Sequence, residues 1–196
     1  MDLMVRRRQL MGMQTGGLPS EYRAVEYIGS TGQQKLDTGI KGDCTFDFTA
    51  RCTEWSAVQI VLGRGFNAGQ YIAKKEYWQL GGNNVFNQTS PTDWTNIHIE
   101  FVVEGSVGTA TIDGVTKTAS GGGGSTQNSS YCLFSDPARS YPSYVYISKC
   151  LCWKNGILVA NFLPCVRKSD SKPGMYDTVS KTFFTNSGTG EFIIPT

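Results

Sequence analysis

The chain has 196 residues, of which 39% are hydrophobic and 12% aromatic, and this size suits one domain with a substantial core. Lysine and arginine number 18 against 16 acidic residues, and a net charge of +2 is too small for the basic surface of a nucleic-acid-binding module. No stretch approaches the roughly 18 consecutive apolar residues of a membrane span. We therefore expect neither nucleic acid nor a membrane as a partner. With 23 glycines and only 17% charged residues, the composition favours strands and turns.

The first segment, residues 1–18, differs from the remainder. It contains four methionines and Arg6, Arg7 and Arg8 against a single aspartate, so it carries the whole formal charge of +2. An amphipathic helix over residues 2–13 would be too short to be stable alone in water, and the apolar stretch of a secretory signal is missing. We predict an N-terminal basic anchoring arm, residues 1–18, and a β-sandwich, residues 19–196. A disordered tail is the alternative for the arm.

From residue 21 onward, period-two patterns and short apolar runs alternate with turn residues, which is typical of an antiparallel β-sandwich. Asp113-Gly114 and Asn155-Gly156 stand between alternating strands and predict type I′ hairpins. The glycine-rich stretch 120–130 predicts a surface loop. Too many strands are predicted for one sheet: 24–28, 35–38, 44–52, 59–64, 70–73, 77–80, 97–104, 108–112, 115–118, 131–134, 145–153, 157–164, 174–177 and 182–184.

Six cysteines lack any paired C-x-x-C spacing, and a domain of this size does not require disulfides. We expect reduced thiols that behave as small core residues. Cys150 and Cys152 lie on the same side of a predicted strand, so a metal or disulfide site there is the alternative. We predict no cofactor and no metal, and leave open whether calcium binds at a loop such as Asp37 or Asp43.

Two stretches carry a family resemblance. The first is L-P-S-E-Y-R-A-V-E-Y-I-G-S-T-G at residues 18–32, followed by D-T-G-I at 37–40. Later come Y-I-S-K-C at 146–150, N-G-I-L-V-A-N-F-L-P-C at 155–165, R-K-S-D at 167–170, G-M-Y-D at 174–177 and F-F-T-N-S-G-T-G at 183–190. Over residues 18–192 the chain resembles the concanavalin A-like, laminin G-like domains of phage and prophage structural proteins from gut bacteria.

The resemblance implies an all-β fold, an antiparallel jelly-roll sandwich with an N-terminal arm. Such sandwiches serve as sugar-binding modules, adhesion modules and spacers, so fold alone does not fix function. Arg6, Arg7, Arg8, Leu10 and Met11 look like the short arm that precedes these domains, and we assign them to virion anchoring. An arm of this kind orders on assembly with another virion protein.

The sequence contains few groups of residues that resemble known catalytic sites. Glycoside hydrolases of this fold need two carboxylates on one strand face, and the nearest pairs in sequence lack their Glu-x-Asp-x-x-Glu spacing. Those pairs are Glu21 with Glu26, Glu100 with Glu104, and Asp43 with Asp47. His98 is the single histidine, and its strand directs it away from the apolar face. Since no Gly-x-Ser-x-Gly elbow accompanies it, we expect no enzyme and no catalytic residue.

A sugar site needs an aromatic platform together with amides or carboxylates for the hydroxyls. The middle segment offers both, although alternation there leaves open which aromatic residue is core. The same uncertainty holds for Trp55, Trp94 and Trp153. The candidate ligand-binding residues are Tyr71, Tyr77, Trp78, Asn83, Asn84 and Asn87.

These observations predict a non-catalytic phage virion structural protein, a capsid decoration, head fibre or tail-associated part. It would be assembled in the host cytoplasm and contact other virion proteins through its arm. A host or mucosal glycan is the candidate ligand, and a homo-oligomer is plausible because virion proteins often repeat the symmetry of their site. The alternatives are a bacterial surface carbohydrate-binding module and, third, a glycoside hydrolase.

Overall fold

The computed structural model describes residues 17–52, 58–65, 71–74, 78–80, 84–85, 96–120, 128–137 and 143–194. Within these ranges the chain forms two antiparallel sheets that pack as a sandwich, without a helix. The predicted all-β antiparallel sandwich is confirmed. Across the same residues, no helix is long and apolar enough to cross a membrane.

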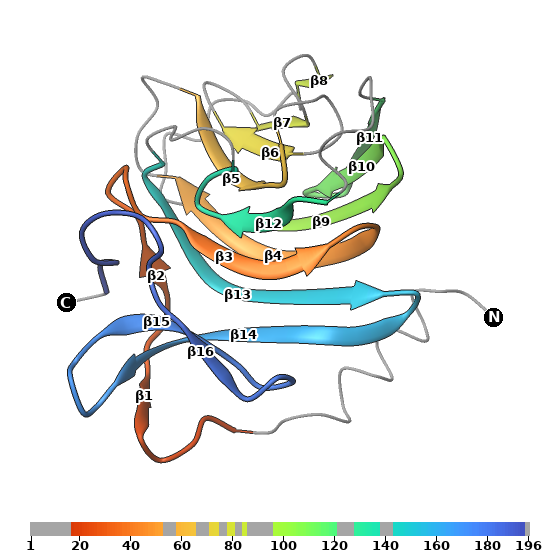
Figure 1. Ribbon diagram of the computed structural model, residues 1–196. Helices are drawn as coiled ribbons and strands as arrows, with labels where there is room; N and C mark the ends of the chain where they lie inside the picture. The colour runs from red at the N-terminus through yellow and green to blue at the C-terminus, as the bar shows by residue number, and fades with distance from the viewer. Residues whose placement is uncertain are drawn as a thin grey trace.

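The larger sheet has ten strands in the order β11-β10-β9-β4-β13-β14-β15-β16, with β1 added along β14 and β2 along β13 (Figure 1). β14 pairs with β13 over its first half and with β1 over its second half. The strands are β1 (Tyr22–Ala24), β2 (Ile28–Gly29), β4 (Cys44–Cys52), β9 (Ile97–Glu104), β10 (Val107–Ile112), β11 (Val115–Ser120), β13 (Val145–Lys154), β14 (Ile157–Arg167), β15 (Pro173–Asp177) and β16 (Thr182–Phe184).

The smaller sheet has six strands in the order β3-β12-β5-β6-β7-β8. Its strands are β3 (Leu36–Lys41), β5 (Gln59–Gly63), β6 (Tyr71–Lys74), β7 (Trp78–Leu80), β8 (Asn84–Val85) and β12 (Ser130–Leu133). β12 lies between β3 and β5, so segments far apart in sequence alternate within this sheet.

The central strands of the ten-stranded sheet follow the period of two seen in the sequence. Along β4, buried Cys44, Phe46, Phe48, Ala50 and Cys52 alternate with half-buried residues. Along β9, four apolar residues are buried, whereas the intervening His98 is exposed, as its strand pattern predicts. One face of this sheet therefore belongs to the core and the other meets solvent.

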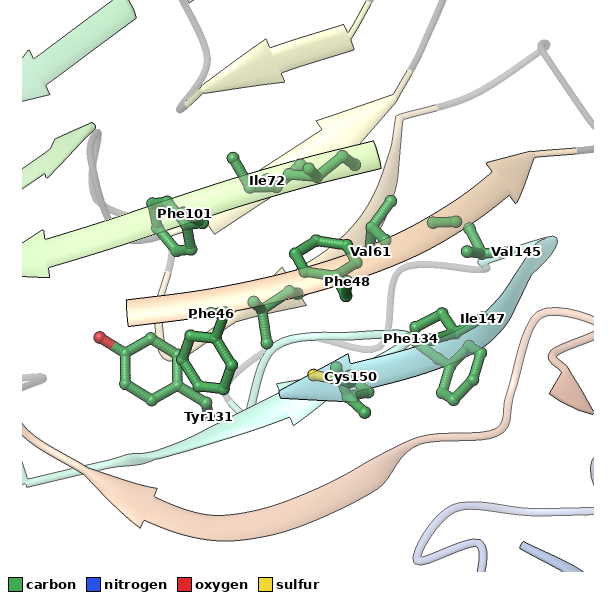
Figure 2. Packing of buried hydrophobic residues seen from close by; sticks show 14 of the residues in the cluster. Phe46, Phe48, Val61, Ile72, Phe101, Tyr131, Phe134, Val145, Ile147 and Cys150 are labelled. Carbon is green, nitrogen blue, oxygen red and sulfur yellow. The ribbon is translucent and has the colours of Figure 1, made fainter. Parts of the chain in front are cut away.

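Aromatic and aliphatic side chains from both sheets fill the space between them (Figure 2). Phe46 of β4 meets Tyr131 of β12 with ring centroids 4.8 Å apart in an edge-to-face arrangement. Phe134, just after β12, packs against Phe192 at 5.0 Å. Burial of such rings is the main source of stability in a sandwich core.

In the six-stranded sheet, β5 and residues 71–73 of β6 are buried on both faces, whereas β3 at the sheet edge alternates buried and exposed residues. All five residues of β5 are buried. Leu62 and Ile72 belong to the core between the sheets, whereas Ile60, Tyr71 and Ala73 form a second cluster with Val58 alongside. Hydrophobic runs without alternation are typical of strands covered on both sides.

Both predicted hairpin turns have the required backbone. Asp113 and Gly114 have φ of +48° and +79°, and Asn155 and Gly156 have φ of +51° and +77°. Two consecutive positive φ angles define the type I′ turn that matches the twist of the flanking strands. The two hairpin predictions are confirmed.

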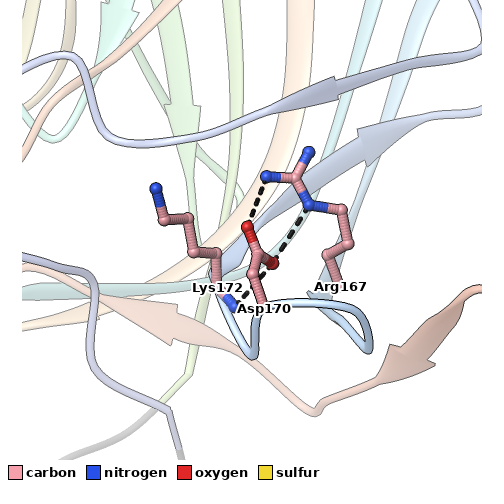
Figure 3. A network of polar contacts seen from close by, with 3 residues as sticks. All are labelled: Arg167, Asp170 and Lys172. Carbon is pink, nitrogen blue, oxygen red and sulfur yellow. Dashed lines mark hydrogen bonds and ion pairs between the residues drawn. The ribbon is translucent and has the colours of Figure 1, made fainter.

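The turn between β14 and β15 contains a bidentate ion pair between Arg167 and Asp170 (Figure 3). Arg167 donates from Nε and Nη2 to the two carboxylate oxygens of Asp170 at 3.1 and 2.7 Å. The backbone N–H of Lys172 donates to the same carboxylate at 3.2 Å. The guanidinium first, and then the backbone donor, lower the pKa of Asp170 to about 2.

Residues 29–35 and residues 185–193 interlock, and we call this pair of segments the terminal clasp. Gly29 and Ile193 exchange two backbone hydrogen bonds of 2.8 and 2.9 Å. A Cβ on Gly188 would overlap a backbone carbonyl oxygen of the opposite segment, so glycine is required for this approach. Two stretches that carry the family resemblance thus form one piece of structure.

Candidate functional site

The predicted ligand-binding segment lies at one edge of the six-stranded sheet. Lys74 of β6 pairs with Trp78 of β7, and Leu80 of β7 pairs with Asn84 of β8. Strands carrying Tyr71, Trp78 and Asn84 are therefore neighbours, and we call β6, β7 and β8 the edge strands. Leu80 is buried in the core and Gln79 is half-buried. Tyr77, Asn83 and Asn87 fall outside the described residues.

Tyr71 does not have the exposed position that a sugar platform requires. It is only 2% exposed and packs with Ile60 and Ala73. Its Cβ lies 2.9 Å from the point where a Cβ on Gly63 would stand, so the two strands approach closely there. The interpretation of Tyr71 as a surface ligand residue is corrected to that of a packing residue, because both faces of β5 and of residues 71–73 are buried.

The arm residues assigned to virion anchoring, Arg6, Arg7, Arg8, Leu10 and Met11, lie outside the described residues. The structure does describe how the chain joins the sandwich. Lys168, in the turn after β14, donates from its backbone N–H to the carbonyl of Glu21 at 2.9 Å and from Nζ to the carbonyl of Ser20 at 2.6 Å. Residues that follow the arm are therefore fixed to the β14–β15 turn.

A second polar surface lies on the solvent side of the ten-stranded sheet, and we call it the open face. Thr111 and Thr116 hydrogen-bond across β10 and β11 at 2.9 Å, and Thr109 and Thr118 do so at 3.0 Å. The open face consists of Thr45, Asp47, Thr49, His98, Glu100, Thr109, Thr111, Thr116 and Thr118, which follow one another across four paired strands.

An Asp–His contact lies within the open face. His98 Nε2 is 2.9 Å from Asp47 Oδ1, with side chains 62% and 24% exposed. In strand register, Asp47 stands directly opposite Glu100. Like charges in that relation destabilise a sheet. Sequence spacing misses this pair of carboxylates because they come from strands about fifty residues apart.

An aromatic group adjoins the open face where β2 pairs with β13. The guanidinium of Arg51 lies 4.2 Å from the ring centroid of Tyr27 and 4.9 Å from that of Tyr146. The two rings meet edge to face at 4.8 Å, and burial raises the pKa of Tyr146. Tyr146 also covers Gly29, where a Cβ would collide with the ring. This group stabilises the sheet, since its members cover one another.

Metal ligands do not gather in the described part of the chain, where no group of three or more His, Cys, Asp or Glu side chains is placed to hold an ion. The two carboxylates considered for calcium cap turns. Asp37 Oδ1 accepts the N–H of Gly39 at 2.9 Å, and Asp43 Oδ1 accepts the N–H of Gly105 at 2.9 Å. All six cysteines are buried free thiols.

A small hollow lies beside the terminal clasp. Its volume is about 90 Å³, well below the several hundred Å³ of a typical ligand pocket. Its lining is Lys172, Pro173, Thr185, Asn186, Gly190, Glu191 and Phe192. The hollow is too small to hold a sugar ring.

No protein-family model and no curated protein matches the chain. Among solved structures, it is similar to sialidases of Trypanosoma rangeli. A mutant with trans-sialidase activity matches at 16% identity and a TM-score of 0.43, over 59% of this chain and 22% of its own. The sialidase in complex with 2,3-difluorosialic acid matches at 14% identity and a TM-score of 0.46, over 70% of this chain and 27% of its own. The chain spans about a quarter of the length of these enzymes.

These matches correct one expectation from the sequence. We expected a protein that is not an enzyme, whereas the matched structures are enzymes, and we withdraw that expectation. At this identity and these TM-scores, the likeness assigns neither a family nor an activity to the chain. The structure establishes an all-β antiparallel sandwich, and no phage or concanavalin A-like family is shown.

Proposed function

We propose that the protein is a carbohydrate-binding β-sandwich displayed on a phage virion, with its glycan site on the edge strands. One observation carries the glycan part of this proposal. The pairing of β6, β7 and β8 brings the predicted aromatic and asparagine positions, Trp78 and Asn84 among them, onto adjacent strands at one sheet edge. Aromatic and amide residues are the types that recognise sugars, and here they occur on neighbouring strands.

The virion part of the proposal rests on the resemblance and on the basic arm. The chain after the arm is hydrogen-bonded to the β14–β15 turn of the ten-stranded sheet, whereas the edge strands belong to the six-stranded sheet. Anchoring and recognition would thus use separate regions of the molecule. An arm bound to another virion protein leaves the edge strands available for a host or mucosal glycan.

A glycan array probed with the full chain tests the glycan part. We expect specific binding, lost in Trp78→Ala and Asn84→Ala and retained in His98→Ala, which changes the open face instead. Circular dichroism shows whether each variant is folded. Binding that is lost only in His98→Ala would place the site on the open face. Absence of binding to every glycan on the array would contradict glycan binding.

Particle assembly tests the virion part. A chain lacking residues 1–18 should be absent from purified particles, and alanine at Arg6, Arg7 and Arg8 should reduce its occupancy. A truncated chain present at full occupancy removes the role of the arm. Fractionation that finds the intact chain on the surface of source bacteria without particles favours a bacterial surface module.

A second candidate function, glycoside hydrolysis, is supported by the carboxylate pair of the open face. Asp47 and Glu100 are directly opposite each other on adjacent strands, which is the kind of proximity that two-carboxylate hydrolysis requires. A polysaccharide panel should then show turnover that Asp47→Asn and Glu100→Gln each abolish. Turnover that survives both substitutions excludes this pair as its source.

A further inference from the structure

Four side chains from four different segments meet between the sheets near the β3–β4 turn. They are Cys44 at the start of β4, Arg64 just after β5, Tyr131 on β12 and Cys152 on β13, and we call them the Cys44 cluster. Arg64 is 0% exposed and Cys44 is 5% exposed. The proposed glycan site on the edge strands does not include this fully buried arginine or the thiols around it.

Arg64 is a buried cation whose partners, among the residues described, are all neutral. Its Nη1 donates to the carbonyl of Gly42 at 2.9 Å and its Nη2 to the carbonyl of Gly105 at 2.6 Å. Its guanidinium lies 5.3 Å from the ring centroid of Tyr131, and its Nε has no hydrogen-bond partner. A buried charge is costly unless an opposite charge accompanies it, so this site favours a nearby anion.

The carbonyl oxygen of Gly42 receives more donors than it can accept. Arg64 donates at 2.9 Å, the hydroxyl of Tyr131 at 3.3 Å and the thiol of Cys44 at 3.6 Å. A carbonyl oxygen offers two lone pairs, and a thiol is the weakest of these three donors. Cys44 can therefore lose its proton without leaving this acceptor unsatisfied.

The charged and polar groups that face Cys44 also favour its anionic form. The Cys152 thiol interacts with Cys44 and lowers its pKa, with smaller contributions from Tyr131, Arg64 and Lys154, against the opposing effect of burial. Cys150, on the same strand as Cys152, stays protonated, because burial raises its pKa.

The buried thiols elsewhere behave in the opposite way. Burial raises the pKa of Cys132 to about 12 and that of Cys165 to about 11. The interaction with Cys44 first, and then burial, also raise the pKa of Cys152.

We propose that Cys44 is a reactive thiolate, with Arg64 as its buried counter-ion, and that hydroperoxides oxidise it. The sulfur anion attacks the terminal oxygen of the peroxide, the O–O bond breaks, and sulfenic acid forms on Cys44. The departing hydroxide or alkoxide takes a proton from solvent and leaves as water or alcohol. Thiolate character beside Arg and Lys is the usual basis of such reactivity.

Alkylation of the folded full chain with iodoacetamide, located by mass spectrometry, tests the thiolate. Cys132 and Cys165 are matched buried controls. We expect Cys44 to react at least about tenfold faster than either control near pH 7, because each pKa unit is a factor of ten in thiolate fraction. Equal rates at Cys44 and Cys132 would overturn the proposal.

The pH profile and peroxide treatment complete the test. The midpoint for alkylation of Cys44 should lie below the ordinary thiol range and should rise in Tyr131→Phe, which keeps the ring and removes the hydroxyl donor. After hydrogen peroxide, dimedone should trap sulfenic acid at Cys44. A midpoint at or above the ordinary range, or dimedone label on other cysteines instead, contradicts the assignment. The wild-type profile decides even where the variant fails to fold.

Discussion

The two sheets of the sandwich differ in how the residues of their strands are buried. In the ten-stranded sheet, buried residues of β4 and β9 alternate with half-buried or exposed ones, so one face is core and the other is the open face. In the six-stranded sheet, β5 is buried throughout, and the cluster of Ile60, Tyr71 and Ala73 lies apart from the shared core. Alternation in sequence therefore identifies a surface along β4 and β9 and fails to do so along β5.

The largest effect is expected where both sheets share the core. Phe101→Ala removes a fully buried ring from β9 and should lower the free energy of unfolding by about 3–5 kcal/mol. Urea denaturation followed by circular dichroism measures this change. A cost near zero would mean that the two sheets do not rely on a common core.

A matched pair of substitutions tests whether the far side of the six-stranded sheet is truly interior. Ile60→Ala should cost about 2–5 kcal/mol, because Ile60 is 0% exposed outside the shared core. Val102→Ala, at a half-buried position of β9, should cost a fraction of that. Equal costs in the same denaturation assay would erase the difference between the sheets.

The open face should contribute little to stability. Thr111→Ala breaks the 2.9 Å hydrogen bond to Thr116 and should cost about 0.2–1 kcal/mol, the usual range for a cross-strand pair. A double-mutant cycle with Thr116→Ala isolates the coupling. A coupling well above that range would show that the threonines support the fold rather than form a replaceable surface.

The smallest effect concerns the ion pair at the β14–β15 turn. The pKa of Asp170 is lowered to about 2 in the folded chain, so the pair stabilises the fold above the ordinary aspartate pKa of about 3.9. That contribution disappears as the pH falls through about 2. Asp170→Asn should therefore melt slightly lower than wild type at pH 7, with the difference vanishing in strong acid. A difference that persists there would assign the effect to packing.

Much of the ten-stranded sheet follows from local patterns. The predicted strands 44–52 and 97–104 coincide with β4 and β9, and the two hairpins have their expected turn backbone. Each pattern here depends on nearest neighbours and one buried face, which sequence periodicity captures. Strand β14 is longer than its predicted range 157–164, because β1, from a distant segment, and β15, from the next one, both pair with its second half.

The sequence does not predict what depends on distant contacts. Tyr71 is an aromatic residue of the kind that stacks on sugars, yet it is buried, because it packs with Ile60 and Ala73 on a second covered face of β5 and β6. Arg64 would be placed on the surface by its charge, yet carbonyl groups from two turns and the Tyr131 ring enclose it. Asp47 and Glu100 become neighbours only through strand pairing.

The terminal clasp also constrains how the protein is made. Because Gly29 pairs with Ile193, the pairing of the larger sheet at β2 cannot be completed until Ile193, more than 160 residues later, has left the ribosome. Contacts of such large sequence separation slow folding and leave earlier strands waiting with open edges. Synthesis would thus produce a nascent sandwich that stays open until Ile193 emerges, a period in which chaperones and premature strand pairing compete for it.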